Sequence, residues 1–244
     1  MVDRPRHSSH LQRIRYTIAS TGLLRGLADL AIWLLGYRAD RDRSFDRRYG
    51  TDTGGSVATS ELGIVDDATR DQAILYLPSP ERVTRWMLNT VGINHREYSF
   101  VDLGCGKGRV LLVASTYPFQ QVIGVEISDE LSRIARGNLA RFPDAARKAR
   151  DVEVQNIDAV TVRFPTTHLL VHMYHPFGPD LTRAVLRRLE ESLLEAPRRV
   201  IVAYLLYDDA IKAVDDVFAE FSSLKRQRYE RSVLGHYNWL FYAN

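Results

Sequence analysis

Short apolar runs alternate with segments of helical periodicity from about residue 80 to the end of the chain. The expected strands are 99–103, 121–127, 152–156, 168–174 and 199–206, and the expected helices are 80–91, 108–116, 129–141, 179–195 and 208–219. Ser79 and Pro80 mark the first of these helices, as a cap residue and as a proline at the first helical position. The alternation predicts an α/β fold with a doubly wound, mainly parallel sheet and right-handed crossovers.

The C-terminal segments predict a departure from the parallel pattern. Two runs, 223–231 and 236–243, lie close together and have the turn Leu234-Gly235 between them. They predict an antiparallel hairpin, which brings the expected sheet to seven strands.

The first part of the chain has no such alternation. Residues 1–45 predict one or two helices, and Leu23–Tyr37 within them predicts an amphipathic helix. With Arg25 and Asp29 this helix is too charged, and also too short, to span a bilayer. It is expected to pack on the core, with a contact to a membrane surface as the minor alternative.

A Gly-, Thr- and Asp-rich stretch, 46–72, follows these helices and predicts an irregular loop. A loop of this length is interpreted either as a lid over a ligand site or as a plain linker. The expected organisation is therefore an N-terminal helical extension with a lid-like loop, 1–72, and a Rossmann-like ligand-binding domain, 73–244.

The segment 101–108, Val-Asp-Leu-Gly-Cys-Gly-Lys-Gly, follows a predicted strand and opens a predicted helix. Its three alternating glycines predict a tight turn with positive φ, against which a ligand can lie. A triphosphate-binding loop and a dinucleotide-binding loop starting at Gly104 each need glycine at position 109, where this chain has Arg109. Both patterns therefore fail. The carboxylate of Asp102 at the strand end offers a partner for a cation.

The remaining pattern, Asp-x-Gly-x-Gly-x-Gly, resembles motif I of the class I, seven-strand S-adenosylmethionine (SAM) methyltransferases. The resemblance covers about 98–178 and extends to the C-terminal part by architecture. It implies that 73–244 is a Rossmann-like methyltransferase domain with SAM as its cofactor, in which the glycine loop holds the methionyl part. The implied contacts in and beside this loop are Asp102, Gly104, Cys105, Gly106 and Gly108.

Two later strand ends agree with this resemblance. Glu126 lies 18 residues after Gly108, and an acid about 20 residues beyond a nucleotide loop can accept bonds from both ribose hydroxyls. Alternatively, Glu126 is a solvated strand-end charge. Asp158 ends the next strand, where the resemblance implies a bond to the adenine amino group and a backbone N–H, that of Ala159, near the ring. Ile127, beside Glu126, belongs to the same implied site.

The fourth strand ends in Tyr174-His175-Pro176-Phe177, at the place of the family's motif IV. In many members that act on nitrogen this motif begins with Asn or Asp, so His175 leaves the acceptor atom open between nitrogen and oxygen. His175 is interpreted as a general base or an acceptor-positioning group, or else as a strand-end histidine bonded to backbone. The expected acceptor-pocket residues are Tyr76, Tyr174, Pro176 and Phe177. His172 is expected to be buried and hydrogen-bonded.

Composition limits the class of protein. A chain of 244 residues with 45% hydrophobic and 26% charged residues can bury a sizeable globular core. Cys105 is the single cysteine, which excludes an internal disulfide and favours a reducing, cytoplasmic location. No His, Cys, Asp or Glu cluster has metal-ligand spacing, so no metal is expected.

Charge is concentrated at the start of the chain. Residues 1–50 hold ten Arg and five Asp, a net of +5, whereas the whole chain carries +3. A basic segment of this kind can meet an acidic partner, an anionic lipid surface or nucleic acid, or form a solvated arm. Because no aromatic residues interleave with the basic ones, a nucleic-acid partner is disfavoured.

These observations predict an enzyme that transfers a methyl group from SAM to a nitrogen or oxygen of an acceptor, with a small molecule favoured. The motif and the acid-tipped second strand also resemble seven-strand lysine methyltransferases, so a protein acceptor is the alternative. A deep closed pocket favours the first and an open groove the second. A non-catalytic SAM- or nucleotide-binding partner protein also remains open, and a nicotinamide oxidoreductase is weakened by Arg109.

Overall fold

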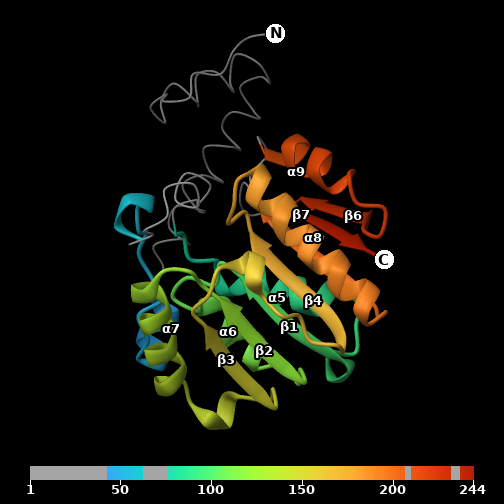
Figure 1. Cartoon of the computed structure of the whole chain (residues 1–244). Helices are drawn as coiled ribbons and strands as arrows, with labels where there is room; N and C mark the ends of the chain where they lie inside the picture. The colour runs from blue at the N-terminus through green and yellow to red at the C-terminus, as the bar shows by residue number, and fades with distance from the viewer. Residues whose placement is uncertain (1–42, 63–75, 207–209, 232–236) are drawn as a thin grey trace, which may run out of the picture.

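The computed structural model describes residues 43–62, 76–206, 210–231 and 237–244. Its centre is a seven-stranded sheet in the order β3-β2-β1-β4-β5-β7-β6 (Figure 1). The strands are β1 (Tyr98–Leu103), β2 (Gln121–Val125), β3 (Asp151–Gln155), β4 (His168–Tyr174), β5 (Val200–Leu206), β6 (Lys225–Arg231) and β7 (Asn238–Ala243). The strands β1 to β5 pair in parallel, whereas β7 runs antiparallel to both β5 and β6. The predicted fold class is confirmed.

Helices cover both faces of this sheet. The α-helices of the described residues are α3 (Ser44–Tyr49), α5 (Glu81–Thr90), α6 (Arg109–Ser115), α7 (Asp129–Arg141), α8 (Pro179–Glu195) and α9 (Ile211–Phe218). One apolar cluster packs α5, α6 and α7 on the face that carries Phe100 and Val122. A second cluster packs α8 and α9 on the opposite face, which carries Val101 and Val171, and Figure 1 shows α8 crossing it. The alternation of side chains along each strand thus builds a three-layer molecule.

Most predicted elements are confirmed, some of them at both ends. The helices 129–141 and 179–195 and the strand 168–174 have the predicted bounds, whereas the other elements are shifted at their ends by up to three residues. The helix α7 begins where predicted because the Ser128 hydroxyl accepts a hydrogen bond from the Leu131 N–H at 3.4 Å and caps it.

Two local predictions were wrong. Ser79 does not cap α5: Pro80 holds the cap position with no side-chain hydrogen bond, and the buried Ser79 hydroxyl has no partner among the described residues. Residues 46–49 are not irregular but form most of α3. Packing outside the helix stabilises it, since Phe45 and Tyr49 both pack on Phe142, which follows α7.

Several predictions fall on residues outside those described. They are the helices expected in residues 1–42 with the amphipathic Leu23–Tyr37, the part of the predicted loop at 63–72 with the domain boundary after residue 72, and the turn at Leu234-Gly235. Across the described part of the chain, no helix has the length and apolar character needed to cross a membrane.

Candidate functional site

A cavity of about 220 Å³ lies at the carboxyl ends of β1, β2 and β4, where open α/β sheets bind their ligands. Twelve of the fourteen predicted site residues line it: Tyr76, Asp102, Gly104, Cys105, Glu126, Ile127, Asp158, Ala159, Tyr174, His175, Pro176 and Phe177. The two exceptions are Gly106, which lies against the Tyr76 ring, and Gly108, which lies against Ala135. The sequence motifs therefore converge on one cavity, although they are spread over a hundred positions of the chain.

The glycine loop, residues 104–108, turns sharply between β1 and α6. Gly104, Gly106 and Gly108 have φ values of 75°, 54° and 83°, a region that glycine adopts without strain. The N–H groups of Gly104 and Cys105 both donate to the Val125 carbonyl, at 2.9 and 3.0 Å, and fix the loop to β2. Gly106 lies directly under the Tyr76 ring, since a Cβ there would lie 2.1 Å from a ring carbon. Gly106 thus shapes the cavity without lining it.

Glu126 fastens the same loop from the end of β2. One carboxylate oxygen accepts the Gly106 N–H at 2.8 Å and the other accepts the Ser128 N–H at 2.9 Å. Burial raises the pKa of Glu126, an effect that these backbone hydrogen bonds oppose. Each oxygen can accept a further bond, so the carboxylate keeps capacity for a pair of ligand hydroxyls.

Asp102 pairs with a histidine that the sequence analysis did not connect to it. The register of β1 and β4 places Asp102 opposite His172, and the His172 Nδ1 lies 2.6 Å from a carboxylate oxygen of Asp102. Both side chains are buried. His172 is buried as predicted, but its Nε2 has no hydrogen-bond partner within the described ranges. Both residues line the cavity, so the strand-tip acid is oriented by its neighbour in the sheet.

The third acid, Asp158, follows β3. Its carboxylate accepts the Val160 N–H at 3.1 Å and starts a short 3₁₀ turn at Ala159–Thr161. Between Asp158 and Glu126 the wall is apolar, formed by Ile127, Leu131, Ile157 and Ala159. This part of the cavity can therefore enclose a flat apolar ring between two acids.

The end of β4 forms the opposite side. Among the described residues other than glycine, His175 alone has a positive φ, of 39°. Its Nδ1 lies 3.1 Å from the Tyr204 hydroxyl. Burial raises the pKa of Tyr204, so this hydroxyl stays protonated. A bulky residue in this conformation costs about 1–3 kcal/mol and persists where the surroundings over-determine it. The strain singles out His175 among the residues of this wall.

Cys105 is a packing residue in this geometry. Its side chain is buried, and its sulfur lies 2.7 Å from where a Cβ at Gly124 would be. Burial, with the charges of Glu126 and Asp102, raises the pKa of the Cys105 thiol. The thiol is therefore held neutral and is a poor nucleophile.

Sequence reasoning missed several residues of the cavity wall: Leu62, Leu77, Pro78, Ser79, Arg109, Val110, Val125, Leu131, Ile157, His172 and Leu181. Four of them, Leu77, Arg109, Val125 and Ile157, directly precede or follow a predicted site residue, so adjacency was the available signal for these four. Leu77, Pro78 and Ser79 had a further one, because they lie between Tyr76 and a predicted helix start. The part of the chain that the structure describes holds no group of three His, Cys, Asp or Glu side chains that could bind a metal ion.

Comparisons with known proteins agree on one family. Residues 100–195 match the family model described as a methyltransferase domain. A protein-lysine N-methyltransferase from Saccharolobus islandicus is 32% identical over 113 residues, which is 44% of this chain and 68% of that protein.

Solved structures with similar folds include two methyltransferases. The ribosomal protein L11 methylase from Lactobacillus delbrueckii subsp. bulgaricus is 16% identical, with a TM-score of 0.49 over 66% of this chain and 76% of that one. The magnesium protoporphyrin IX methyltransferase from Synechocystis PCC 6803, solved with bound SAM, is 13% identical, with a TM-score of 0.49 over 99% of this chain and 100% of that one. The relative from Saccharolobus and the family model, which covers the glycine loop, decide the assignment: the chain belongs to the class I SAM-dependent methyltransferases.

Proposed function

We propose that this enzyme methylates the ε-amino nitrogen of a lysine in a protein substrate. The observation that carries the proposal is the 32% identity to a protein-lysine N-methyltransferase. The cavity agrees with it, because Leu77, Pro78, Tyr174 and Phe177 offer apolar and aromatic surface to an aliphatic side chain. In this proposal the three acids of the described lining, Asp102, Glu126 and Asp158, all contact the cofactor and not the acceptor.

The cavity wall fits SAM. The buried carboxylate of Asp102 suits the ammonium of the methionyl part, and Glu126 retains acceptor capacity for the ribose hydroxyls. The apolar wall that ends at Asp158 and Ala159 suits adenine, with a carboxylate for its amino group. In this proposal Gly104 and Cys105 lie against the cofactor, whereas Gly106 and Gly108 set the shape of the loop.

The sulfonium of SAM supplies an activated methyl group, so the protein needs mainly to position the acceptor. Positioning alone can contribute about 7–11 kcal/mol. A lysine amine must also lose its proton, and histidine is the side chain that most readily accepts one near neutral pH. His175, held by Tyr204 on the cavity wall, is the histidine that we assign to receive this proton.

Replacing His175 with alanine is expected to lower turnover by about tenfold or more, while the affinity for S-adenosylhomocysteine (SAH) stays unchanged. The reason is that this proposal places the acceptor, and not the cofactor, beside His175 on the cavity wall. His175→Asn is the matched variant, because asparagine tolerates the left-handed backbone and restores a polar head. If His175 is a base, both variants are equally slow; if it only positions the acceptor, His175→Asn is close to wild type. Wild-type turnover in His175→Ala would refute either role.

The raised pKa of Glu126 predicts how SAH affinity depends on pH. Burial raises its pKa above the ordinary value of 4.5, so the ligand-free protein holds the proton more tightly than the unfolded chain does. Ionising Glu126 therefore destabilises the ligand-free protein as pH rises above 4.5, whereas donation from ribose hydroxyls favours the ionised form. SAH affinity should rise with pH through this window, as measured by calorimetry. A Glu126→Gln variant should lose the pH dependence, and an unchanged slope in that variant would contradict the role.

The acceptor class is tested with SAM carrying a radiolabelled methyl group. The acceptors are a heat-treated cell extract separated into protein, RNA and small-molecule fractions, and poly-lysine. The proposal expects label in protein that acid hydrolysis releases as methylated lysine. Label confined to RNA or to small molecules, or label in protein on another residue, would contradict it.

A further inference from the structure

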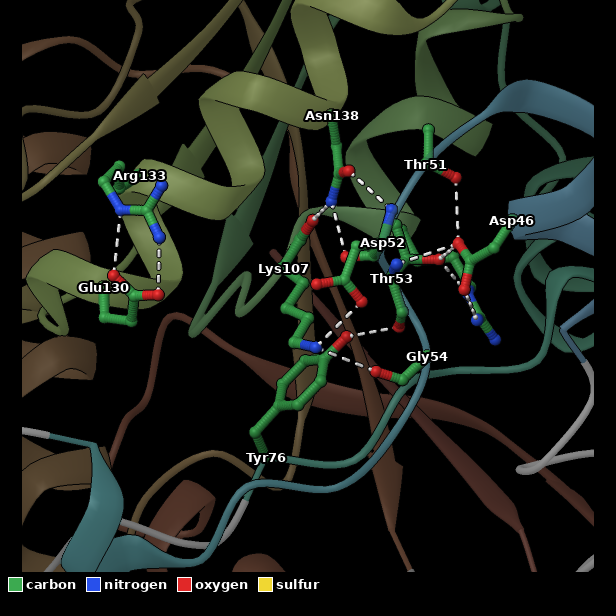
Figure 2. Close-up of polar contacts among 11 residues, drawn as sticks. Asp46, Thr51, Asp52, Thr53, Gly54, Tyr76, Lys107, Glu130, Arg133 and Asn138 are labelled. Atoms are coloured by element: carbon green, nitrogen blue, oxygen red, sulfur yellow. Dashed lines mark hydrogen bonds and ion pairs between the residues drawn. The ribbon is translucent and has the colours of Figure 1, made fainter.

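A segment far from the family's motifs lies against the glycine loop. Residues 44–54, here called the N-terminal strap, comprise α3 and the segment after it. The strap contacts Arg109 at the start of α6 and Asn138 in the C-terminal part of α7, and Figure 2 shows Asn138 beside Asp52 of the strap. Phe45 anchors the strap, since its ring stacks on Phe142 with centroids 6.3 Å apart and lies under the Arg109 guanidinium at 5.7 Å. The strap is therefore packed into the core.

Polar contacts join the strap to the loop through one buried threonine. The Arg109 Nε donates to the Thr53 hydroxyl at 2.7 Å, and that hydroxyl donates to Asp46 at 2.6 Å. The Thr53 carbonyl accepts the Tyr76 hydroxyl at 2.8 Å, and the Tyr76 ring covers Gly106. Thr53 thus contacts the glycine loop indirectly at two points, at its end through Arg109 and at its middle through Tyr76, which covers Gly106.

Asn138 of α7 makes a second connection. Its amide nitrogen donates to the carbonyls of Asp52, at 2.8 Å, and Lys107, at 2.9 Å, and its amide oxygen accepts the Asp52 N–H at 2.7 Å. The Lys107 ammonium in turn donates to Asp52 at 3.1 Å and to the Gly54 carbonyl at 3.0 Å. Figure 2 shows these side chains converging on the strap. Strap and loop are therefore joined at Lys107 as well as through Arg109 and Tyr76.

The contacts also balance charge. Arg109 is 3% exposed, and the Asp46 carboxylate at 3.6 Å is its counter-charge. Burial by itself would raise the pKa of Asp46, but hydrogen bonds from Thr53 and Thr51 and the charge of Arg109 lower it, so the carboxylate is ionised at neutral pH. A buried guanidinium is costly without such a partner, which ties the start of α6 to the strap.

We propose that the N-terminal strap is a working part of the cofactor site. Asp46 and Thr53 act as positioning residues: they hold Arg109 and Tyr76, and through them the glycine loop, in the conformation that binds the cofactor. The inference rests on the assignment of the cavity to SAM and not on the lysine acceptor, so it stands or falls separately from the acceptor. The glycine loop is then supported by residues that lie 55 and 56 positions before their partners in the chain.

Thr53→Val tests the proposal, because valine keeps the shape and the carbonyl that binds Tyr76 but removes the bridging hydroxyl. SAH affinity is measured by calorimetry well below the melting transition, and the melting temperature is measured without ligand. Thr53→Val should weaken SAH binding about tenfold, and Thr53→Ser, which restores the hydroxyl, should recover it.

Two controls separate positioning from general stability. Val217 of α9 belongs to the apolar cluster on the other face of the sheet from the strap. Val217→Ala should lower the melting temperature and leave SAH affinity unchanged. Glu130→Gln removes an exposed ion pair with Arg133 on α7 (Figure 2) and should change neither quantity. The proposal is overturned if Thr53→Val binds SAH as the wild type does, or if Val217→Ala weakens binding as much as Thr53→Val does.

Discussion

An Asp102→Asn variant is expected to bind SAH about 100-fold more weakly than the wild type, because a buried charge pair with the ligand ammonium is lost. Asparagine keeps the size of the side chain and an oxygen that can accept the bond from His172 Nδ1, 2.6 Å away. The change therefore removes the negative charge and little else. Calorimetry gives the affinity, and thermal melting shows whether the fold is retained.

Asp151→Asn is the matched control. Asp151 is an exposed acid at the start of β3, on the same sheet but at the amino end of its strand. The Asp151→Asn variant should bind SAH with wild-type affinity. If Asp102→Asn also binds with wild-type affinity while melting normally, Asp102 does not hold the ammonium and the proposed seating of the cofactor is wrong.

A Gly106→Ala variant is expected to lose SAH binding and to lower the free energy of unfolding. Gly106 has a φ of 54°, and an added Cβ would lie 2.1 and 2.2 Å from two carbons of the buried Tyr76 ring. A left-handed conformation costs about 1–2 kcal/mol for a residue other than glycine, and the steric overlap adds about 1–3 kcal/mol. The ring cannot move cheaply because the strap holds its hydroxyl. Denaturant unfolding and calorimetry measure the two effects.

Gly92→Ala separates the two costs. Gly92 has a φ of 77°, but an added Cβ there meets nothing within 4 Å. This variant should show the conformational cost alone and should keep SAH affinity. Equal destabilisation of both variants would mean that the contact between Tyr76 and Gly106 contributes nothing.

Local chemistry explains what the sequence could predict. The bounds of α7 were predicted because Ser128 caps the helix and the apolar periodicity continues to Arg141. Asp102, Glu126 and Asp158 were placed together because the carboxyl ends of parallel strands share one edge of the sheet. In each case the information lies within one element or in the order of elements.

The remaining features depend on contacts between distant residues. Arg109 counted in the sequence only as a failed glycine position, yet it is a buried anchor whose partner, Thr53, lies 56 residues away. His172 and Asp102 are 70 residues apart and meet through the register of β1 and β4. The helix α3 lay hidden in a Gly- and Thr-rich stretch because Asp46, Thr51 and Thr53 stabilise its end through side chains. Hydrophobic periodicity carries no signal for such pairs.

The cavity at the carboxyl ends of β1, β2 and β4 is assigned here to the methyl donor. Calorimetric titration of the wild-type protein with SAH, and separately with NAD, tests this assignment most directly. We expect micromolar binding of SAH and no measurable binding of NAD. Binding of NAD in preference to SAH, or no binding of SAH by a folded protein, would contradict it.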